Sequence, residues 1–150
     1  MKKHTERSCF RAALALLAAA TLLASCGKSK KPTAFADGTY TGKSSVFEAD
    51  ESGNGAGYGE AEITVKDNKI IACTFKLYEP DGTLKDENYG AGLSQENRLK
   101  AQKAVQAADR YAEAAVAAGS ADGVDAISGA TLSYNEFIEA VNDALSKAAQ

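Results

Sequence analysis

The sequence predicts an α+β fold in which a small antiparallel sheet of about three to four strands packs against two helices. Three segments, residues 39–47, 61–66 and 71–77, alternate apolar with polar positions or are rich in β-branched and aromatic residues, and turn residues separate them. Two later segments, residues 95–118 and 133–148, instead repeat apolar residues every three or four positions, as amphipathic helices do.

The first 25 residues are predicted to be a lipoprotein signal peptide and no part of the fold. Basic residues precede an apolar run at positions 12–23, and twelve residues at about 1.5 Å each cannot cross about 30 Å of hydrocarbon. The ending Leu-Ala-Ser-Cys resembles a lipobox, so we expect Cys26 to be lipidated and to anchor the protein in the bilayer. Simple export with a free Cys26, or a short uncleaved anchor, are the alternatives. Residues 26–36 then form a short linker.

Composition limits the remaining functions. Four of the 17 basic residues and one of the 20 acidic residues lie in positions 1–25, which leaves 13 basic and 19 acidic residues and a net charge of −6. This balance argues against nucleic acid as a partner. The 125 residues that remain are the usual size of one domain, predicted at residues 37–150.

The cysteine and histidine content excludes most redox centres built from side chains. Cys9 and the single histidine, His4, leave with the signal peptide, and Cys26 is the predicted anchor, so Cys73 remains alone. No disulfide or CxxC element is available, and we expect no metal site. Any redox role therefore requires an organic cofactor.

The predicted sheet begins after the turn signal Asp37-Gly38 with the strand at residues 39–47. The glycine-rich run at residues 49–57 is interpreted as a loop, because neither Lys-Ser/Thr nor a helix follows it as a phosphate-binding loop requires. Residues 61–66 and 71–77 form a hairpin around Asp67-Asn68, and its buried face is predicted to carry Ile71, Cys73, Phe75 and Leu77. Cys73 is interpreted as a packed small hydrophobe.

A polar loop at residues 79–93 separates the hairpin from the first helix. Loops longer than about 12 residues tend to be functional or disordered. Its Tyr89-Gly90-Ala91-Gly92 segment either presents an aromatic ring and bare backbone to a flat ligand or is a solvent-facing turn, and the sequence does not separate the two. The helix is expected between Ser94 as its N-cap and Gly119 as its C-terminal stop.

The second helix is expected to start at Ser133, which with Glu136 forms a capping-box pattern. The predicted apolar stripe of this helix comprises Tyr134, Phe137, Ile138, Val141, Leu145 and Ala148. Its free N–H groups and dipole favour an anion just ahead of it, where Gly129 permits close approach to the backbone and Thr131 supplies a hydroxyl.

The stretch Asp125, Ser128, Gly129, Ala130 and Thr131 resembles the Asp-x-x-Ser/Thr-Gly-Ala-Thr/Ser pattern of FMN-binding domains. That family includes subunits of sodium-pumping NADH:quinone oxidoreductase and of the Rnf complex, and small flavin-carrying surface lipoproteins of Gram-positive bacteria. The segment at residues 37–44 and the strands after it share the likeness. In such proteins a flavin transferase consumes FAD and esterifies the last hydroxyl of the motif to the phosphate of FMN. The resemblance implies Thr131 as the acceptor, although Ser133 is a second nearby hydroxyl.

The resemblance implies an extracytoplasmic lipoprotein, anchored at the cell membrane, that carries covalent FMN and relays electrons from a quinone- or NADH-linked membrane donor to soluble or surface acceptors. Cofactor contacts are expected from Asp125, Ser128, Gly129, Ala130, Thr131, Ser133 and Tyr89. No residue resembles a proton-transfer catalyst, so the sequence names no catalytic residue. It favours an electron carrier without substrate turnover of its own. The alternative is a non-redox ligand-binding or sensory lipoprotein of the same fold.

Overall fold

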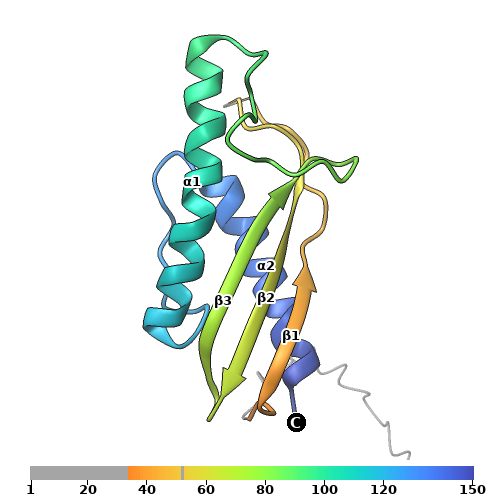
Figure 1. Ribbon diagram of the computed structural model, residues 1–150, viewed down its shortest axis with the longest axis vertical. Helices are drawn as coiled ribbons and strands as arrows, with labels where there is room; N and C mark the ends of the chain where they lie inside the picture. Colours follow the sequence, from red (N-terminus) through yellow and green to blue (C-terminus); the bar gives the residue numbers. More distant parts are fainter. Residues whose placement is uncertain (1–33, 52) are drawn as a thin grey trace, which may run out of the picture. The chain divides into compact units, whose positions relative to one another are not determined.

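The computed structural model describes residues 34–51 and 53–150, all within the compact unit Lys31–Gln150. The predicted signal peptide and Cys26 lie outside the described residues. The elements are β1 (Gly38–Lys43), β2 (Tyr58–Lys66), β3 (Lys69–Tyr78), α1 (Gln95–Ala118) and α2 (Thr131–Ala148). The strands form one antiparallel sheet in the order β1-β2-β3, with α1 packed on β3 and α2 on β1 and β2 (Figure 1). The predicted α+β fold is confirmed for the described part of the chain.

The β2–β3 hairpin turns where the sequence predicts it. Asp67 and Asn68 have φ values of 51° and 60°, and two successive residues with positive φ match the right-handed twist of paired strands. Strand β1 is shorter than predicted, since it ends at Lys43 and Phe47 pairs with Gly57 only in an isolated bridge. At the end of β1, two carboxylates of α2 accept hydrogen bonds from the backbone. Asp143 accepts from the N–H of Lys43, and Glu139 accepts from the N–H of Ser45.

The buried face of β3 departs from the predicted alternation at one position. Ile70 is 3% exposed and Ile71 is 50% exposed, so the assignment of Ile71 to the buried face is wrong. The register explains the difference, since Thr64 pairs with Ala72 and Val65 pairs with Ile70, leaving Ile71 as the extra residue of a bulge. A bulge reverses the facing of the residues beyond it. Past the bulge Phe75 and Leu77 are buried and Cys73 is partly buried against the core, as predicted.

Helix α1 has the predicted boundaries. The Ser94 side chain accepts a hydrogen bond from the backbone N–H of Asn97 at 3.3 Å. Gly119 stops the helix with a φ of 69°, in the left-handed region, and its N–H donates to the carbonyl of Val116. A side-chain N-cap and a left-handed glycine at the C-terminus both stabilise a helix by satisfying backbone groups that its ends leave unpaired.

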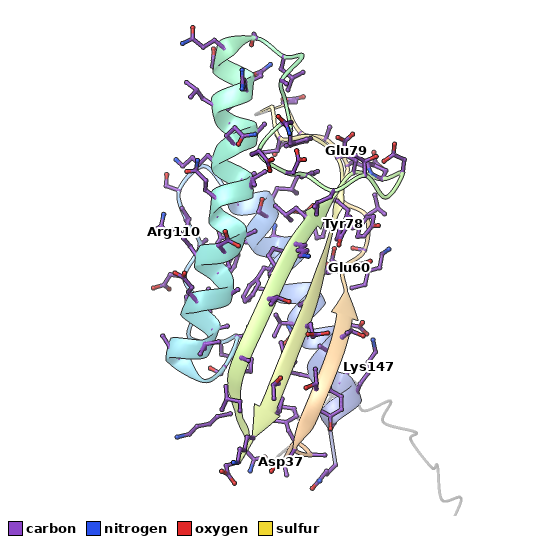
Figure 2. All side chains as sticks on the ribbon, viewed as in Figure 1. Asp37, Glu60, Tyr78, Glu79, Arg110 and Lys147 are labelled. Carbon is purple, nitrogen blue, oxygen red and sulfur yellow. The ribbon has the colours of Figure 1, made fainter. Side chains whose placement is uncertain are left out.

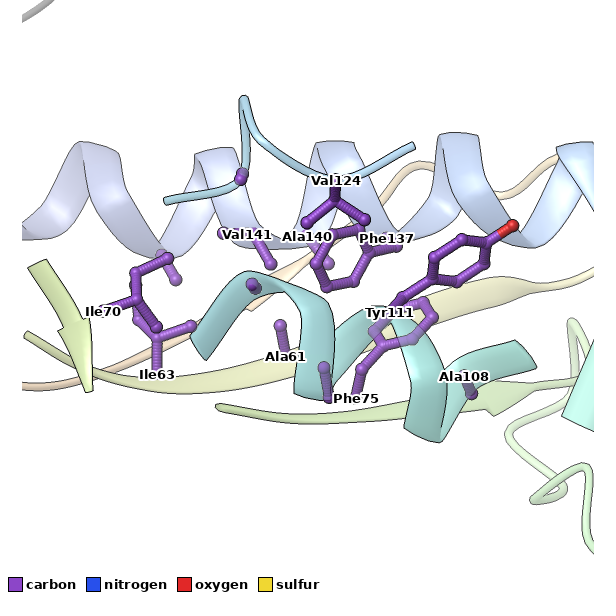
Figure 3. Packing of buried hydrophobic residues seen from close by; sticks show 14 of the residues in the cluster. Ala61, Ile63, Ile70, Phe75, Ala108, Tyr111, Val124, Phe137, Ala140 and Val141 are labelled. Atoms are coloured by element: carbon purple, nitrogen blue, oxygen red, sulfur yellow. The ribbon is translucent and has the colours of Figure 1, made fainter. Parts of the chain in front are cut away.

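The core lies between the sheet and the two helices (Figure 3). Phe137 of α2 is fully buried, with its ring centre 5.2 Å from that of Phe75 and 5.5 Å from that of Tyr111. Gly42 lets β1 approach α2 closely, because a Cβ there would overlap the backbone of Ala140 and Ala144. The predicted stripe of α2 is confirmed, with Phe137, Val141 and Ala148 buried and Tyr134, Ile138 and Leu145 packed partly against the core.

The other face of the sheet is open and polar, and Figure 2 labels Glu60 and Tyr78 near its upper end. Lys43 lies 3.5 Å above the ring of Tyr58, which stacks on Tyr78, and 3.4 Å from Glu60. No described helix is long and apolar enough to span a membrane.

Candidate functional site

The segment before α2 holds its motif residues in a tight turn. Gly129 has a φ of 75°, which disfavours a residue with a side chain, and the N–H of Ala130 donates to the carbonyl of Ile127 at 2.9 Å. The helix then begins at Thr131, and its side chain is exposed. Thr131 is therefore the first residue of the helix and lies at its positive end.

The predicted start of this helix at Ser133 is wrong. Ala130 is the N-cap and makes no side-chain capping bond, and Tyr134 donates its N–H to the carbonyl of Ala130. Ser133 and Glu136 lie inside the helix and are 3% and 1% exposed. The two residues do not form a capping box because neither occupies the N-cap position, which Ala130 holds.

Tyr111 of α1 fixes the motif to the rest of the domain. Its fully buried hydroxyl donates to the carbonyl of Ala130 and accepts from the backbone N–H of Ile127, both at 3.0 Å. Burial raises the pKa of Tyr111, so the hydroxyl remains a donor at neutral pH. This single side chain therefore connects both ends of the turn that precedes Thr131.

A lysine of α1 stands beside the same turn. An ideal Cβ built on Gly129 would lie 2.9 Å from Nζ of Lys103. The ammonium group therefore lies against the bare backbone of the motif. A helix N-terminus with an adjacent cation suits a phosphate group.

The remaining motif residues differ in accessibility. Asp125 and Ser128 are exposed and line a shallow hollow together with Arg110 of α1, whereas Ala130 is 1% exposed. The structure thus brings Ser128, Gly129 and Thr131 to one turn with Lys103, and leaves Asp125 at its outer edge.

A cleft of about 270 Å³ opens next to the start of α2. Its walls come from four parts of the chain. These are residues 49, 50 and 53–55 in the loop before β2; Lys85, Tyr89 and Leu93 in the loop after β3; the first turns of α1; and Leu132, Ser133 and Glu136 of α2. The two loops lie at the same end of the molecule as the first residues of α1 (Figure 1). Ligand pockets commonly measure about 300–1,000 Å³, so the cleft has room for part of a cofactor and not for a large one in full.

Tyr89, which the sequence left between two interpretations, lies in the wall of this cleft and is half-buried. Its ring centre is 5.1 Å from Nζ of Lys85, and burial raises its pKa. The glycine-rich loop, which the sequence does not identify as a phosphate-binding loop, contributes Gly53 and Gly55 to the cleft wall.

The cleft also contains two buried charged groups, neither of which the sequence predicts to be buried. Lys85 is 6% exposed, and its Nζ donates to the carbonyl of Gly55 at 3.3 Å. Burial lowers the pKa of Lys85. It raises the pKa of Glu136 to about 7, against an opposing effect of the Lys85 charge.

One signal for Glu136 was present in the sequence. Glu136 precedes Ala140, Ala144 and Ala148 at steps of four, and these three alanines are buried on one face of α2. No comparable signal marks Lys85, Lys100 or Lys103, because only the folded chain brings them to the cleft or the motif turn. The described residues contain no group of three or more metal-ligating side chains.

Comparison with known proteins identifies the family of the chain. The family model of the FMN-binding domain matches residues 56–146, which is more than half of the chain. A solved structure, that of the CPE2226 protein from Clostridium perfringens, is 22% identical with a TM-score of 0.55, and the match covers 77% of this chain and 89% of that one. At that identity the likeness shows the fold alone. A comparison with curated proteins finds no match. The chain belongs to the FMN-binding domain family.

Proposed function

We propose that the protein carries FMN through a phosphoester to Thr131 and acts as an electron carrier. The observation that carries this proposal is the position of Thr131, an exposed hydroxyl at the first residue of α2 with the preceding turn held by Tyr111 and flanked by Lys103. Ser133, the alternative acceptor, is 3% exposed, and this burial supports Thr131 as the acceptor.

The residues present fit the two ends of FMN. The free N–H groups of the first turn and the ammonium of Lys103 suit the phosphate. Leu132 and Tyr89 give the adjoining cleft an apolar and an aromatic wall, which suits part of a flat ring. Bound FMN supplies reversible transfer of one or two electrons, and the chain holds and orients it.

The attachment step balances with FAD as the donor. The hydroxyl oxygen of Thr131 forms a bond to the phosphorus next to the riboflavin part, the P–O–P bridge of FAD breaks, and AMP leaves. The hydroxyl proton passes to a base of the flavin transferase. A phosphoester keeps the cofactor on the protein outside the cell, where a reversibly bound ligand dissociates whenever its concentration falls below its Kd.

We also propose that Cys26 is lipidated and holds the domain on the extracytoplasmic face of the cell membrane. The support is the signal-like sequence of residues 1–25, which ends at that cysteine. Labelled fatty acid fed to cells should enter the wild-type protein. It should not enter Cys26→Ala, which should lose its membrane association. Label retained in Cys26→Ala would contradict the anchor without affecting the flavin proposal.

The flavin proposal is tested by intact mass after coexpression of the full chain with a flavin transferase. We expect an FMN adduct that survives denaturation in wild type and in Ser133→Ala, and none in Thr131→Ala. Fragmentation should place the adduct on Thr131. An unmodified mass with a transferase that labels another substrate would refute attachment and favour a non-redox ligand-binding or sensory lipoprotein.

A further inference from the structure

Glu136 is a buried carboxyl group without the partner that burial normally requires. The residue is 1% exposed and lines the cleft, and its Oε1 has no hydrogen-bond partner in the described part of the chain. Burying a carboxylate without compensation costs several kcal/mol, and removal of such a group often stabilises a protein. Packing of α2 alone therefore does not account for an acid at this position.

The charges around Glu136 come from each wall of the cleft. Lys85 is the cation whose charge acts on the Glu136 carboxyl, and Glu79 acts in turn on Lys85. Tyr89 faces the same space, and Asp50 and Lys100 line its outer part, where Lys100 pairs with Glu96 at 2.9 Å. Burial raises the pKa of Glu136 to about 7, so this carboxyl changes its charge near neutral pH.

We propose that Glu136 is a redox-linked proton site, whose carboxylate takes up a proton from water when FMN in the cleft is reduced. This inference rests on the proposed function. Thr131 itself does not line the cleft, but Leu132 and Ser133, the two residues after it, do, so the attachment point lies beside the cleft that Glu136 lines.

Electron uptake by FMN and proton uptake by Glu136 together balance in charge and atoms. A reduced donor of the quinol or reduced-flavin class loses an electron, and the FMN in the cleft gains it. An O–H bond forms on the Glu136 carboxylate with a proton supplied by water, so the net charge of the cleft does not change. Added negative charge nearby disfavours the ionised carboxylate, so reduction strengthens proton binding at Glu136.

The test is the pH dependence of the midpoint potential of the flavinylated full-length protein between pH 6 and 9. Above about pH 7 the wild-type potential should fall more steeply with pH than that of Glu136→Gln. If reduction tightens proton binding tenfold, the extra fall totals about 60 mV for this one-electron step. Glu113→Gln, the same change at an exposed position on α1, should follow wild type.

Lys85→Met provides a second test that does not depend on the fold of Glu136→Gln. Removing the cation that favours the ionised carboxylate should move the onset of the steeper region to higher pH. Without flavin, in Thr131→Ala, the carboxyl carbon of Glu136 should titrate near pH 7 in an NMR experiment.

The outcomes separate this inference from the proposed function. Parallel potentials in wild type and Glu136→Gln, or an equal change in Glu113→Gln, would overturn the proton site while leaving the flavin attached. A carboxyl that titrates near its ordinary pKa would do the same. A protein that takes up no FMN at all would overturn both proposals.

Discussion

Tyr111→Phe tests whether one hydroxyl holds the attachment turn. The change removes a single oxygen from a side chain that is fully buried between α1 and α2 and leaves the ring in place. Two hydrogen bonds of 3.0 Å disappear, one to the carbonyl of Ala130 and one from the N–H of Ile127. Because the ring contacts with Phe137 persist, the measured effect reports on the hydroxyl.

The expected loss of stability depends on which hydrogen bonds the two backbone partners of the Tyr111 hydroxyl keep in the variant. The carbonyl of Ala130 still accepts from the N–H of Tyr134 at 3.0 Å, so its loss is a neutral hydrogen bond of about 0.5–1.5 kcal/mol. The N–H of Ile127 loses the acceptor seen in the structure, and an unsatisfied buried donor costs about 1–3 kcal/mol. Since Ile127 is only half-buried, we expect a total near 2 kcal/mol, which for a domain of this size lowers Tm by about 10 °C.

Urea unfolding followed by far-UV circular dichroism measures this cost, since the chain has no tryptophan to report on it. Tyr134→Phe is the matched control, because it removes the same atom from a neighbouring ring whose centre is 5.7 Å from that of Tyr111, and we expect a change below about 0.5 kcal/mol. Flavinylation of Tyr111→Phe should also slow, since the turn before Thr131 is less restrained. Equal stabilities of the two variants would refute the role assigned to the hydroxyl.

Three further predictions concern other parts of the domain. Glu136→Gln should gain stability relative to wild type as pH rises from about 4.5 to 7, by up to about 3 kcal/mol in urea unfolding. The sign follows because the folded wild type keeps the proton to about pH 7, whereas the unfolded chain releases it near 4.5. Gly42→Ala should lower the unfolding free energy by about 3 kcal/mol or more, because the new Cβ overlaps the backbone of Ala140 in α2, and circular dichroism melts would reveal this. Cys73 should react slowly with iodoacetamide at pH 8, because burial raises its pKa to about 11. Labelling in the native state as fast as in urea would contradict this.

The parts of the fold that the sequence predicts well are those fixed by nearby residues. Ser94 and Gly119 determine the ends of α1 through bonds to residues three positions away. The hairpin turn at Asp67 and Asn68 is equally local. The bulge that turns Ile71 outward is not predictable in this way, because it depends on the register between β2 and β3.

In the candidate site, too, features fixed by nearby residues are predictable from the sequence, and features that depend on packing are not. The sequence predicts the motif turn but not the correct start of α2, because Ser133 and Glu136 match a capping-box pattern although both residues lie buried inside the helix. Lys103 and Tyr111 reach the motif from a helix that ends before it, and Lys85 reaches the cleft from a loop after β3. Those contacts depend on how the helices and loops pack, which no local pattern specifies.

Thr131 and Glu136, the two residues of α2 to which roles are proposed, lie on different sides of the same helix end. Thr131 and Glu136 are five positions apart, which at 3.6 residues per turn separates their side chains by about 140° around the axis. This separation leaves an exposed hydroxyl available to a transferase while the carboxyl of Glu136, five positions later, is buried at the wall of the cleft. The tether must then pass the first turn at Leu132 and Ser133, both of which line the cleft. An acceptor hydroxyl on the buried side would be less accessible to the enzyme, so the exposed side of the helix end suits the phosphoester and the buried side suits the proton site.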